Sequence, residues 1–173
     1  MYTPADDEKL SMVMAYTQNG MVRGQTVTKQ GIRVSTWLRT DGAPEYIRLI
    51  QPQLLILAGG QVKTSSCGEL LVPTSQVLGF HLAPPAADPL DYDESEKNRV
   101  WVDVTIMVTS FLIKGKVRIS AQTGFVNSIA TSHISWMSIY ETDVSNPILP
   151  QMGHLQVPML VVRPNQVSFA LES

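Results

Sequence analysis

Three histidines, His81, His133 and His154, are the first residues to consider as metal ligands or acid–base groups. Zinc sites commonly use pairs such as His-x-His or His-x-x-x-His, because that spacing puts both side chains on one face of an element. None of the three has a second ligand at such a spacing, so we interpret them as scattered surface or loop histidines and predict no metal.

Cys67 lies between Ser66 and Gly68. No neighbouring residue in the sequence indicates a catalytic nucleophile, so we interpret it as a plain thiol.

Two carboxylates, Glu141 and Asp143, stand two residues apart near the end of an expected strand. Such a pair on one face could act as the general acid and base of an enzyme. The corresponding positions of the repeat described below hold Gln51 and Gln53, and a solvated strand end explains both acids equally well. Gly59-Gly60 lacks the further residues of a phosphate-binding loop and predicts a turn. We therefore predict no catalytic residues, and we keep an enzyme using Glu141, Asp143 or a histidine as a third hypothesis.

Arg33 and Ser35 form the most suggestive binding position in the chain. A guanidinium at a corner between a strand and a helical turn could hold an anion, or it could donate to backbone carbonyls and stabilise the corner. We favour the structural role and keep Arg33 and Ser35 as a candidate ligand site. Ser35 is expected to start the turn with its hydroxyl on a backbone N–H, and Trp37 and Leu38 are expected to be buried.

The composition is that of an ordinary globular protein. Of the 173 residues, 44% are hydrophobic and 16% are charged, and the net charge of -2 gives no reason to expect a nucleic-acid partner. A single cysteine excludes an intrachain disulfide, and no apolar run approaches the ~20 residues that a membrane helix needs. The first ten residues lack the order of a signal peptide. We expect a cytoplasmic protein with no membrane partner and no cofactor.

A repeat of about ninety residues organises the chain. Residues 46–49 (Tyr-Ile-Arg-Leu) align with residues 136–139 (Trp-Met-Ser-Ile) at an offset of 90, and residues 22–24 align with 113–115 at an offset of 91. With the first offset unchanged, Leu70, Val72, Gln76 and Val77 align with Leu160, Val162, Gln166 and Val167. This pattern predicts a flexible N-terminus over 1–11, a first unit over 12–82, an acidic, proline-containing linker over 83–98 and a second unit over 99–173.

Each unit shows the signals of short antiparallel strands. Apolar residues alternate with polar ones over 100–106, and Gly24 and Gly115 interrupt a strand in each unit, which predicts a bulge or sharp bend. Asn19-Gly20 predicts a hairpin. In the first unit we expect strands over 13–17, 21–28, 46–57, 69–72 and 76–82 and a helical turn over 34–38. We expect mobile loops over 58–68 in the first unit and over 146–153 in the second. The fold class is therefore mostly β, with two tandem, strongly bent, antiparallel barrel-like units of about five strands and one short helical turn each.

The first unit resembles a family of short bacterial domains of unknown function. Members share a strand pair ending in glycine, a Gly-x-Arg-(Leu/Val)-Ser-x-(aromatic)-Leu segment, an (aromatic)-Ile-x-Leu strand and a final strand pair. The matching residues are Gly24, Gly31, Arg33, Val34, Ser35, Trp37, Leu38, Tyr46, Ile47, Leu49, Val72 and Val77. The second unit has no arginine at the place of Arg33. The resemblance implies a small barrel similar to Sm and SH3-like folds, and it implies no activity.

The leading functional hypothesis is a non-enzymatic binding or assembly module that acts through protein–protein contacts. Small units of about 70 residues bury too little surface to be stable alone, so we expect the two copies to pack together. We also expect a homo-oligomer or a protein partner, bound through an edge strand such as 70–72 or 160–162 or through a methionine-bearing face. The alternative is a small-molecule or nucleotide sensor that binds between the units near Arg33. Whether the units form separate barrels or one continuous sheet stays open at this point.

Overall fold

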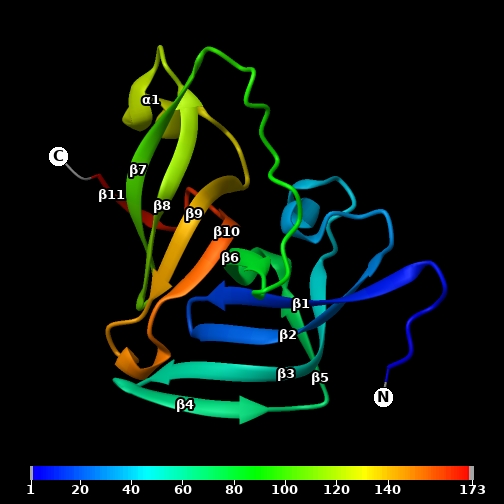
Figure 1. Ribbon diagram of the computed structural model, residues 1–173. Helices are drawn as coiled ribbons and strands as arrows, with labels where there is room; N and C mark the ends of the chain where they lie inside the picture. The colour runs from blue at the N-terminus through cyan, green and yellow to red at the C-terminus, as the bar shows by residue number, and fades with distance from the viewer. Residues whose placement is uncertain (1, 172–173) are drawn as a thin grey trace.

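The computed structural model describes residues 2–171, which form eleven strands, one short α-helix and three 3-10 turns (Figure 1). The first half holds β1 (Glu8–Thr17), β2 (Gly20–Lys29), η1 (Val34–Arg39), β3 (Tyr46–Ala58), β4 (Gln61–Ser66), β5 (Glu69–Pro73), η2 (Thr74–Gln76) and β6 (Val77–Leu82). The second half holds β7 (Arg99–Val108), β8 (Phe111–Ser120), α1 (Gly124–Thr131), β9 (Met137–Ser145), η3 (Pro150–Met152), β10 (Leu155–Val162) and β11 (Ser168–Leu171). No helix within these residues is both long and apolar enough to cross a membrane.

All strand pairs are antiparallel, and they join into one sheet in the order β11-β7-β8-β9-β10-β6-β1-β2-β3-β4, with β5 beside the first part of β3. The mostly β class is confirmed. The two halves meet where β10 pairs with β6, with Val161 opposite Phe80 and Val162 opposite Gly79. The halves therefore share one continuous sheet, which is not closed. This pairing answers the question left open above, and the expectation of two tandem barrel-like units is not confirmed by it.

The two halves repeat one pattern of strand pairing. Val13 lies opposite Gly24 in the first half, and Val104 lies opposite Gly115 in the second, at positions 91 residues further on. Leu49 lies opposite Leu70, and Ile139 lies opposite Leu160, at positions 90 residues further on. Equivalent residues of the sequence repeat thus occupy equivalent strands, as expected for these positions. The expected match of Val77 with Val167 is wrong, because Val77 begins β6 whereas Val167 precedes β11, and Leu82 and Leu171, which pair with the first strand of each half at Val13 and Val104, are 89 residues apart.

An irregularity is confirmed at the level of Gly24 and Gly115, but the bulge lies in the neighbouring strand. Two residues, from Arg23 to Gln25 and from Lys114 to Lys116, span three residues of β3 and of β9, which marks a bulge opposite the glycine at the same place in each half. A Cβ on Gly115 would lie 2.8 Å from Cγ2 of Ile139 and 2.9 Å from the carbonyl oxygen of Tyr140. Glycine is therefore required there because the bent strand brings its backbone against the neighbouring strand.

The predicted hairpin at Asn19-Gly20 is confirmed, since Thr17 lies opposite Gly20 across a two-residue turn. The expected loop over 58–68 is wrong, because β4 occupies most of it and pairs with the end of β3. Gly59 and Gly60 both have positive φ, 58° and 74°, and so allow the tight turn that joins the two strands. The side chains of β4 are mainly polar and exposed, so its sequence carries no alternation of apolar and polar residues from which a strand is recognised.

The core is shared between the halves. One cluster of buried residues lies mainly in the second half and includes Met14, Tyr16 and Leu78 from the first half. The other lies mainly in the first half and includes Trp136 and Val161 from the second. The expectation that the two copies pack on each other is therefore confirmed. Their contact extends from the backbone pairing of β6 and β10 into both clusters of apolar side chains.

Candidate functional site

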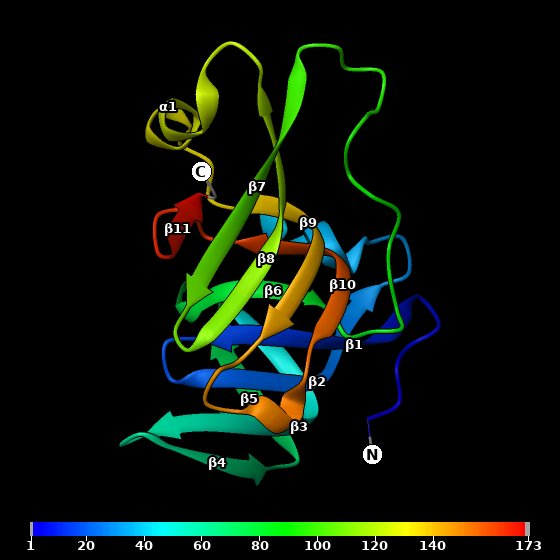
Figure 2. The same ribbon diagram turned by 60° about the vertical axis from the view of Figure 1, so that its left-hand side comes forward.

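The segment over residues 83–98, called the connector below, is bound along much of its length to both halves. It leaves β6, passes beside the junction of the halves and rises along the second half to β7 (Figure 2). Acidic side chains and backbone carbonyls of the connector accept hydrogen bonds from η1, β8 and β9. It is therefore the element that brings most of the polar candidate residues together.

Arg33 and Ser35 lie against the connector. The backbone N–H and the hydroxyl of Ser35 both donate to Oδ2 of Asp88 at 2.8 Å, and the guanidinium of Arg33 donates to the carbonyl oxygen of Pro89. The expected N-cap role of Ser35 is wrong. The residue at the N-cap of η1 is Arg33, which makes no side-chain cap hydrogen bond, and the Ser35 hydroxyl donates to the carboxylate of Asp88 instead of binding a backbone N–H. Trp37 and Leu38 are buried, as expected.

The cavity beside Ser35 is small. A cavity of only about 10 Å³ lies between Ser35, Asp88 and Pro158, and about one water molecule fills that volume. In this structure the donors of Ser35 and the guanidinium of Arg33 therefore serve to bind the connector.

Asp91 joins the connector to both halves at once. Its Oδ2 accepts hydrogen bonds from the guanidinium of Arg39, in η1, and from the hydroxyl of Ser138, in β9, the latter at 2.8 Å. Its Oδ1 accepts a hydrogen bond from the hydroxyl of Tyr140 at 2.7 Å. Arg39 also donates to Ser138 at 2.8 Å, so the four side chains form one closed network. Sequence reasoning missed this network because its members are distant in the chain.

The network keeps Asp91 ionised. Burial of its carboxyl favours the neutral form, but the hydrogen bonds from Tyr140 and Ser138 and the charge of Arg39 outweigh burial, so the pKa of Asp91 lies below its ordinary value. The pKa of Tyr140 is raised by burial and by its hydrogen bond to Asp91. Tyr140 is therefore a neutral donor and Asp91 a charged acceptor, which is the combination that binds the connector most firmly.

Arg118 holds the next part of the connector. Its nearly buried guanidinium donates to the backbone carbonyls of Asp93 and Glu96, the latter at 3.1 Å. The same group lies 5.1 Å from the centre of the Tyr92 ring and 5.9 Å from that of Trp101, within the range of cation–π attraction. The rings of Tyr92, Trp101 and Tyr140 also pack edge to face in pairs, with centroids 5.0–5.4 Å apart.

An open cavity of about 590 Å³ lies between the connector, α1 and β9. Its charged walls, Arg39, Asp91 and Arg118, are engaged in the contacts just described, and Glu96 pairs with Arg99 at 3.5 Å. Hydroxyl groups line the remaining wall, namely those of Ser120, Thr123, Ser128, Thr131 and Ser132. The cavity has room for a small polar molecule, but the charges just named are paired with one another, and the carboxylate of Asp93, which also lines the cavity, accepts hydrogen bonds from Ser95.

Glu141 and Asp143 lie on the same side of β9, and both line an open groove of about 330 Å³. Each contacts a different partner: Glu141 pairs with Nζ of Lys116 at 2.6 Å, and Oδ1 of Asp143 lies within hydrogen-bond distance of Nδ1 of His154, at 2.8 Å. The carboxylates thus make separate contacts at the surface, which is consistent with a solvated strand end.

The histidines do not gather at one place. His133 and His154 are exposed in loops, as expected, but the surface or loop interpretation of His81 is wrong, because His81 lies fully buried in β6. Within residues 2–171 no group of three His, Cys, Asp or Glu side chains is placed to hold a metal ion. Cys67 is exposed and donates to the carbonyl oxygen of Glu69 at 3.3 Å.

The outer side of β3 and β5 exposes large apolar side chains. Tyr46 is 52% exposed and Leu71 is 56% exposed. Because Arg48 lies opposite Leu71 and Tyr46 lies opposite Pro73, these side chains share one face of the strand pair. An ion pair between Arg48 and Glu69, with Nε and Oε1 2.5 Å apart, borders this apolar patch.

Comparison of the chain with protein-family models, with curated proteins and with solved structures gives no match. Its function is therefore inferred from its own residues.

Proposed function

We propose that this protein is a non-enzymatic assembly module that acts through protein–protein contacts. One observation carries the proposal. Tyr46 and Leu71 are 52% and 56% exposed, whereas their equivalents 90 residues further on, Trp136 and Val161, are only 4% and 0% exposed. The second pair is buried because it packs on the first half of the chain.

The patch formed by Tyr46 and Leu71 has the features of a docking edge. Leu71 lies in β5, whose backbone pairs with β3 on one side only among the described residues, so its other edge offers N–H and C=O groups to a further strand. Apolar side chains beside an open edge add burial to backbone pairing, which is how strand addition binds protein partners. The patch of Tyr46 and Leu71 is therefore the surface through which the module is expected to act.

We include in this proposal that each half is a small, strongly bent barrel-like unit of the Sm and SH3-like kind. Support comes from the return of the last strand to the first in each half: β6 pairs with β1, and β11 pairs with β7. The bulges in β3 and β9, opposite Gly24 and Gly115, supply the bend that such a unit needs.

A photo-crosslinking amino acid in place of Leu71 tests the proposal in the cell that makes the protein. Illumination is expected to give a covalent adduct with a protein, and Tyr46→Lys is expected to reduce its yield. The matched control carries the same amino acid at Ile148, which is similarly exposed but lies in the loop before η3. If position 71 gives no more adduct than position 148, the proposal is wrong.

A second candidate function, a small-molecule sensor, is favoured by the cavity of about 590 Å³ beside the connector. The cavity borders Arg39 rather than Arg33, so a ligand there would contact the Asp91 network. Native mass spectrometry of the protein from its own cells tests this candidate. Ser128→Trp fills the cavity. A small molecule that is bound to the unaltered protein and lost in this variant supports a sensor. If the unaltered protein has the mass of the chain alone, this candidate is wrong.

A further inference from the structure

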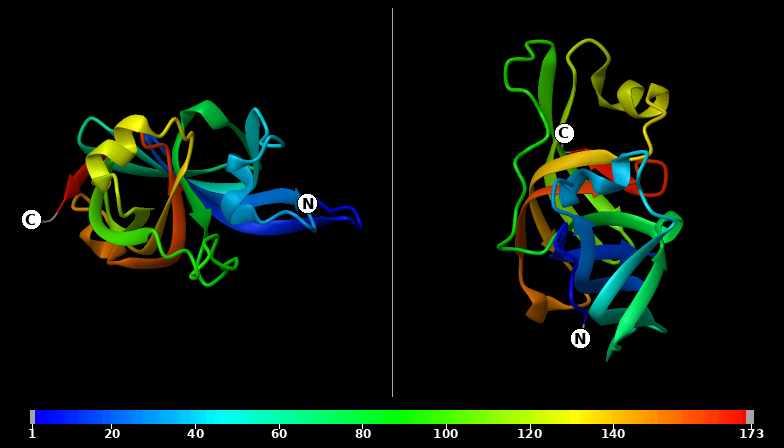
Figure 3. Two further views of the ribbon diagram at one scale, coloured as in Figure 1. Left: turned by 90° about the horizontal axis from the view of Figure 1, so that it is seen from above. Right: turned by 90° about the vertical axis from the view of Figure 1, so that its right-hand side faces the viewer.

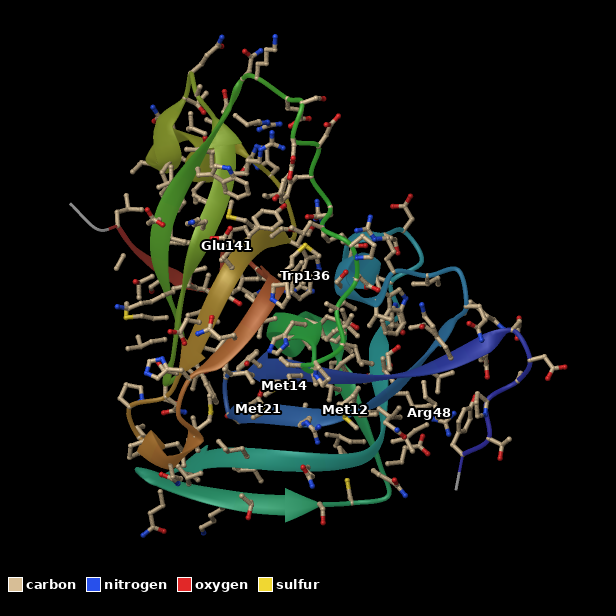
Figure 4. The ribbon with its side chains drawn as sticks, in the orientation of Figure 1. Met12, Met14, Met21, Arg48, Trp136 and Glu141 are labelled. Atoms are coloured by element: carbon tan, nitrogen blue, oxygen red, sulfur yellow. The ribbon has the colours of Figure 1, made fainter. Side chains whose placement is uncertain are left out.

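The contact between the two halves provides a template for a contact between two chains. In it, β10 of the second half pairs antiparallel with β6 of the first, with Val161 opposite Phe80. Trp136, which precedes β9, packs in the same buried cluster as Val34 and Trp37 of η1. Figure 4 shows Trp136 at the junction of the halves, with Arg48 on the opposite side of the first half.

The repeat assigns an equivalent to each strand of this template. Leu71 in β5 is the equivalent of Val161 in β10, because β3 pairs with β5 in the same register as β9 with β10. The equivalent of β6 is β11, because each pairs with the first strand of its own half. Val13 lies opposite Leu82, and Val104 lies opposite Leu171. Residues 79–82 (Gly-Phe-His-Leu) therefore match residues 168–171 (Ser-Phe-Ala-Leu), which makes Phe169 the equivalent of Phe80.

Both equivalent strands have an unpaired edge. Among residues 2–171 no strand pairs with the outer edge of β5 or with that of β11. The second half also exposes apolar side chains where the first half buries them. Val126 in α1, which stands near the place of Val34, is 68% exposed, and Leu171 is 45% exposed, whereas Val34 and Leu82 are buried.

We propose that a second copy of this chain occupies the patch of Tyr46 and Leu71, through antiparallel pairing of β5 in one chain with β11 in the next. If β5 and β11 pair in the register of β10 and β6, Leu71 lies opposite Phe169 and Val72 lies opposite Ser168. Tyr46 then packs toward α1 of the neighbour. This inference rests on the proposed assembly function and names its partner.

The contact is head to tail. β11 and β5 lie far apart in the molecule, so one chain uses both at once: β11 is at the left in Figure 1 and, in red, at the left end of the left view of Figure 3, and β5 is at the lower right in Figure 1. The two surfaces differ, and each chain therefore binds two neighbours by the same contact repeated. The chains then form a row in which the contact between the two halves of one chain alternates with the contact between neighbouring chains.

The contact between chains is weaker than the internal one. In the internal contact the backbone N–H of Arg163 donates to Leu78 at 2.9 Å, and its guanidinium donates to the carbonyls of Val77 and Thr74 at 3.0 Å each. Pro73 stands at the equivalent position and has neither an N–H nor a guanidinium. Assembly is therefore expected to be reversible and to depend on protein concentration.

Sedimentation velocity of the full chain across the micromolar range tests this inference. The unaltered protein is expected to form species heavier than a dimer. Leu71→Lys disables the β5 surface, and the double variant Val126→Lys/Leu171→Lys disables the β11 surface. All three substitutions replace exposed side chains, and near-ultraviolet circular dichroism checks that each variant is folded. Each variant alone is expected to be a monomer. Ile148→Lys, at an exposed position outside both surfaces, is expected to assemble like the unaltered protein.

An equimolar mixture of the two surface variants is the decisive sample. Each variant keeps the surface that the other lacks, so the mixture is expected to form a dimer and nothing larger. A mixture that stays monomeric while the unaltered protein assembles overturns the head-to-tail pairing, as does a variant that still dimerises alone. An unaltered protein that stays monomeric, but forms an adduct with a different protein at position 71, overturns this inference and leaves the proposed function standing. A monomer without any adduct overturns both.

Discussion

The hydroxyl of Tyr16 donates a hydrogen bond to Nε2 of His81 over 3.0 Å, in the interior where β1 and β6 pair. Nδ1 of His81 lies 2.7 Å from the carbonyl oxygen of Leu82 and donates to it, which leaves Nε2 free to accept from Tyr16. Both side chains are fully buried. The imidazole is therefore neutral, with its proton on Nδ1, and burial lowers the pKa of His81 to about 4.

The stability of the protein is expected to fall between pH 6.5 and pH 4 because of His81. In that range the unfolded chain binds a proton on His81, with a pKa near 6.5, and the folded chain does not. The loss amounts to about 3 kcal/mol at pH 4, at 1.36 kcal/mol for each unit of pKa. Urea unfolding at several pH values measures it. His81→Gln should flatten this dependence, whereas the exposed His133→Gln should leave it unchanged; equal slopes in both variants would contradict the assignment.

Asp91→Ala is expected to lower the free energy of unfolding by about 3 kcal/mol, because it leaves Arg39, Ser138 and Tyr140 without their shared acceptor in a largely buried place. Urea unfolding gives the value, and limited proteolysis is expected to cut the connector faster. Asp93→Ala is the matched control: it removes an exposed carboxylate that bonds only within the connector, to Ser95, and is expected to cost much less than Asp91→Ala. Equal losses in the two variants would show that the Asp91 network does not hold the connector.

Asp88→Ala is expected to destabilise the protein more than Ser35→Ala. The first change removes the acceptor of both the N–H and the hydroxyl of Ser35, and the second removes only the hydroxyl. The free energy of unfolding is expected to fall by about 2 kcal/mol in Asp88→Ala and by about 1 kcal/mol in Ser35→Ala, from the usual contribution of such hydrogen bonds. Thermal unfolding ranks the two variants. Melting temperatures that match that of the unaltered protein would argue that this corner has a role other than holding the connector.

Gly115→Ala is expected to cost about 2 kcal/mol, because a Cβ there would meet Ile139 and the backbone of Tyr140 within 3 Å. Gly24→Ala, at the equivalent bulge, is expected to cost less, since its nearest contact is Pro52 at 3.2 Å. Gly42→Ala serves as the control, because its nearest neighbour would lie 3.9 Å away. Calorimetry is expected to order the melting temperatures as Gly42→Ala, Gly24→Ala and Gly115→Ala, from highest to lowest; a different order would show that crowding at the bulge is not what requires glycine.

Local features of this fold were predictable from the sequence. The hairpin at Asn19-Gly20 depends on the positive φ of Gly20, 145°, and the strands at Gly24 and Gly115 need a residue without a Cβ, so a short stretch of sequence is enough to indicate them. The repeat was also visible, because the same apolar spacing recurs where the same strands pair. Burial of Trp37 and Leu38 followed from their spacing on one face of a turn.

The tertiary structure alone decided how the two copies meet and which polar residues matter. Residues 160–162 were expected to be an unprotected edge, yet they pair with β6. His81 was expected at the surface, yet all residues of β6 are buried. Asp91 was part of an acidic linker in sequence, and it becomes a buried acceptor only when η1 and β9 converge on it. Each of these outcomes depends on which distant segments cover a residue, and no local pattern of side chains specifies that contact.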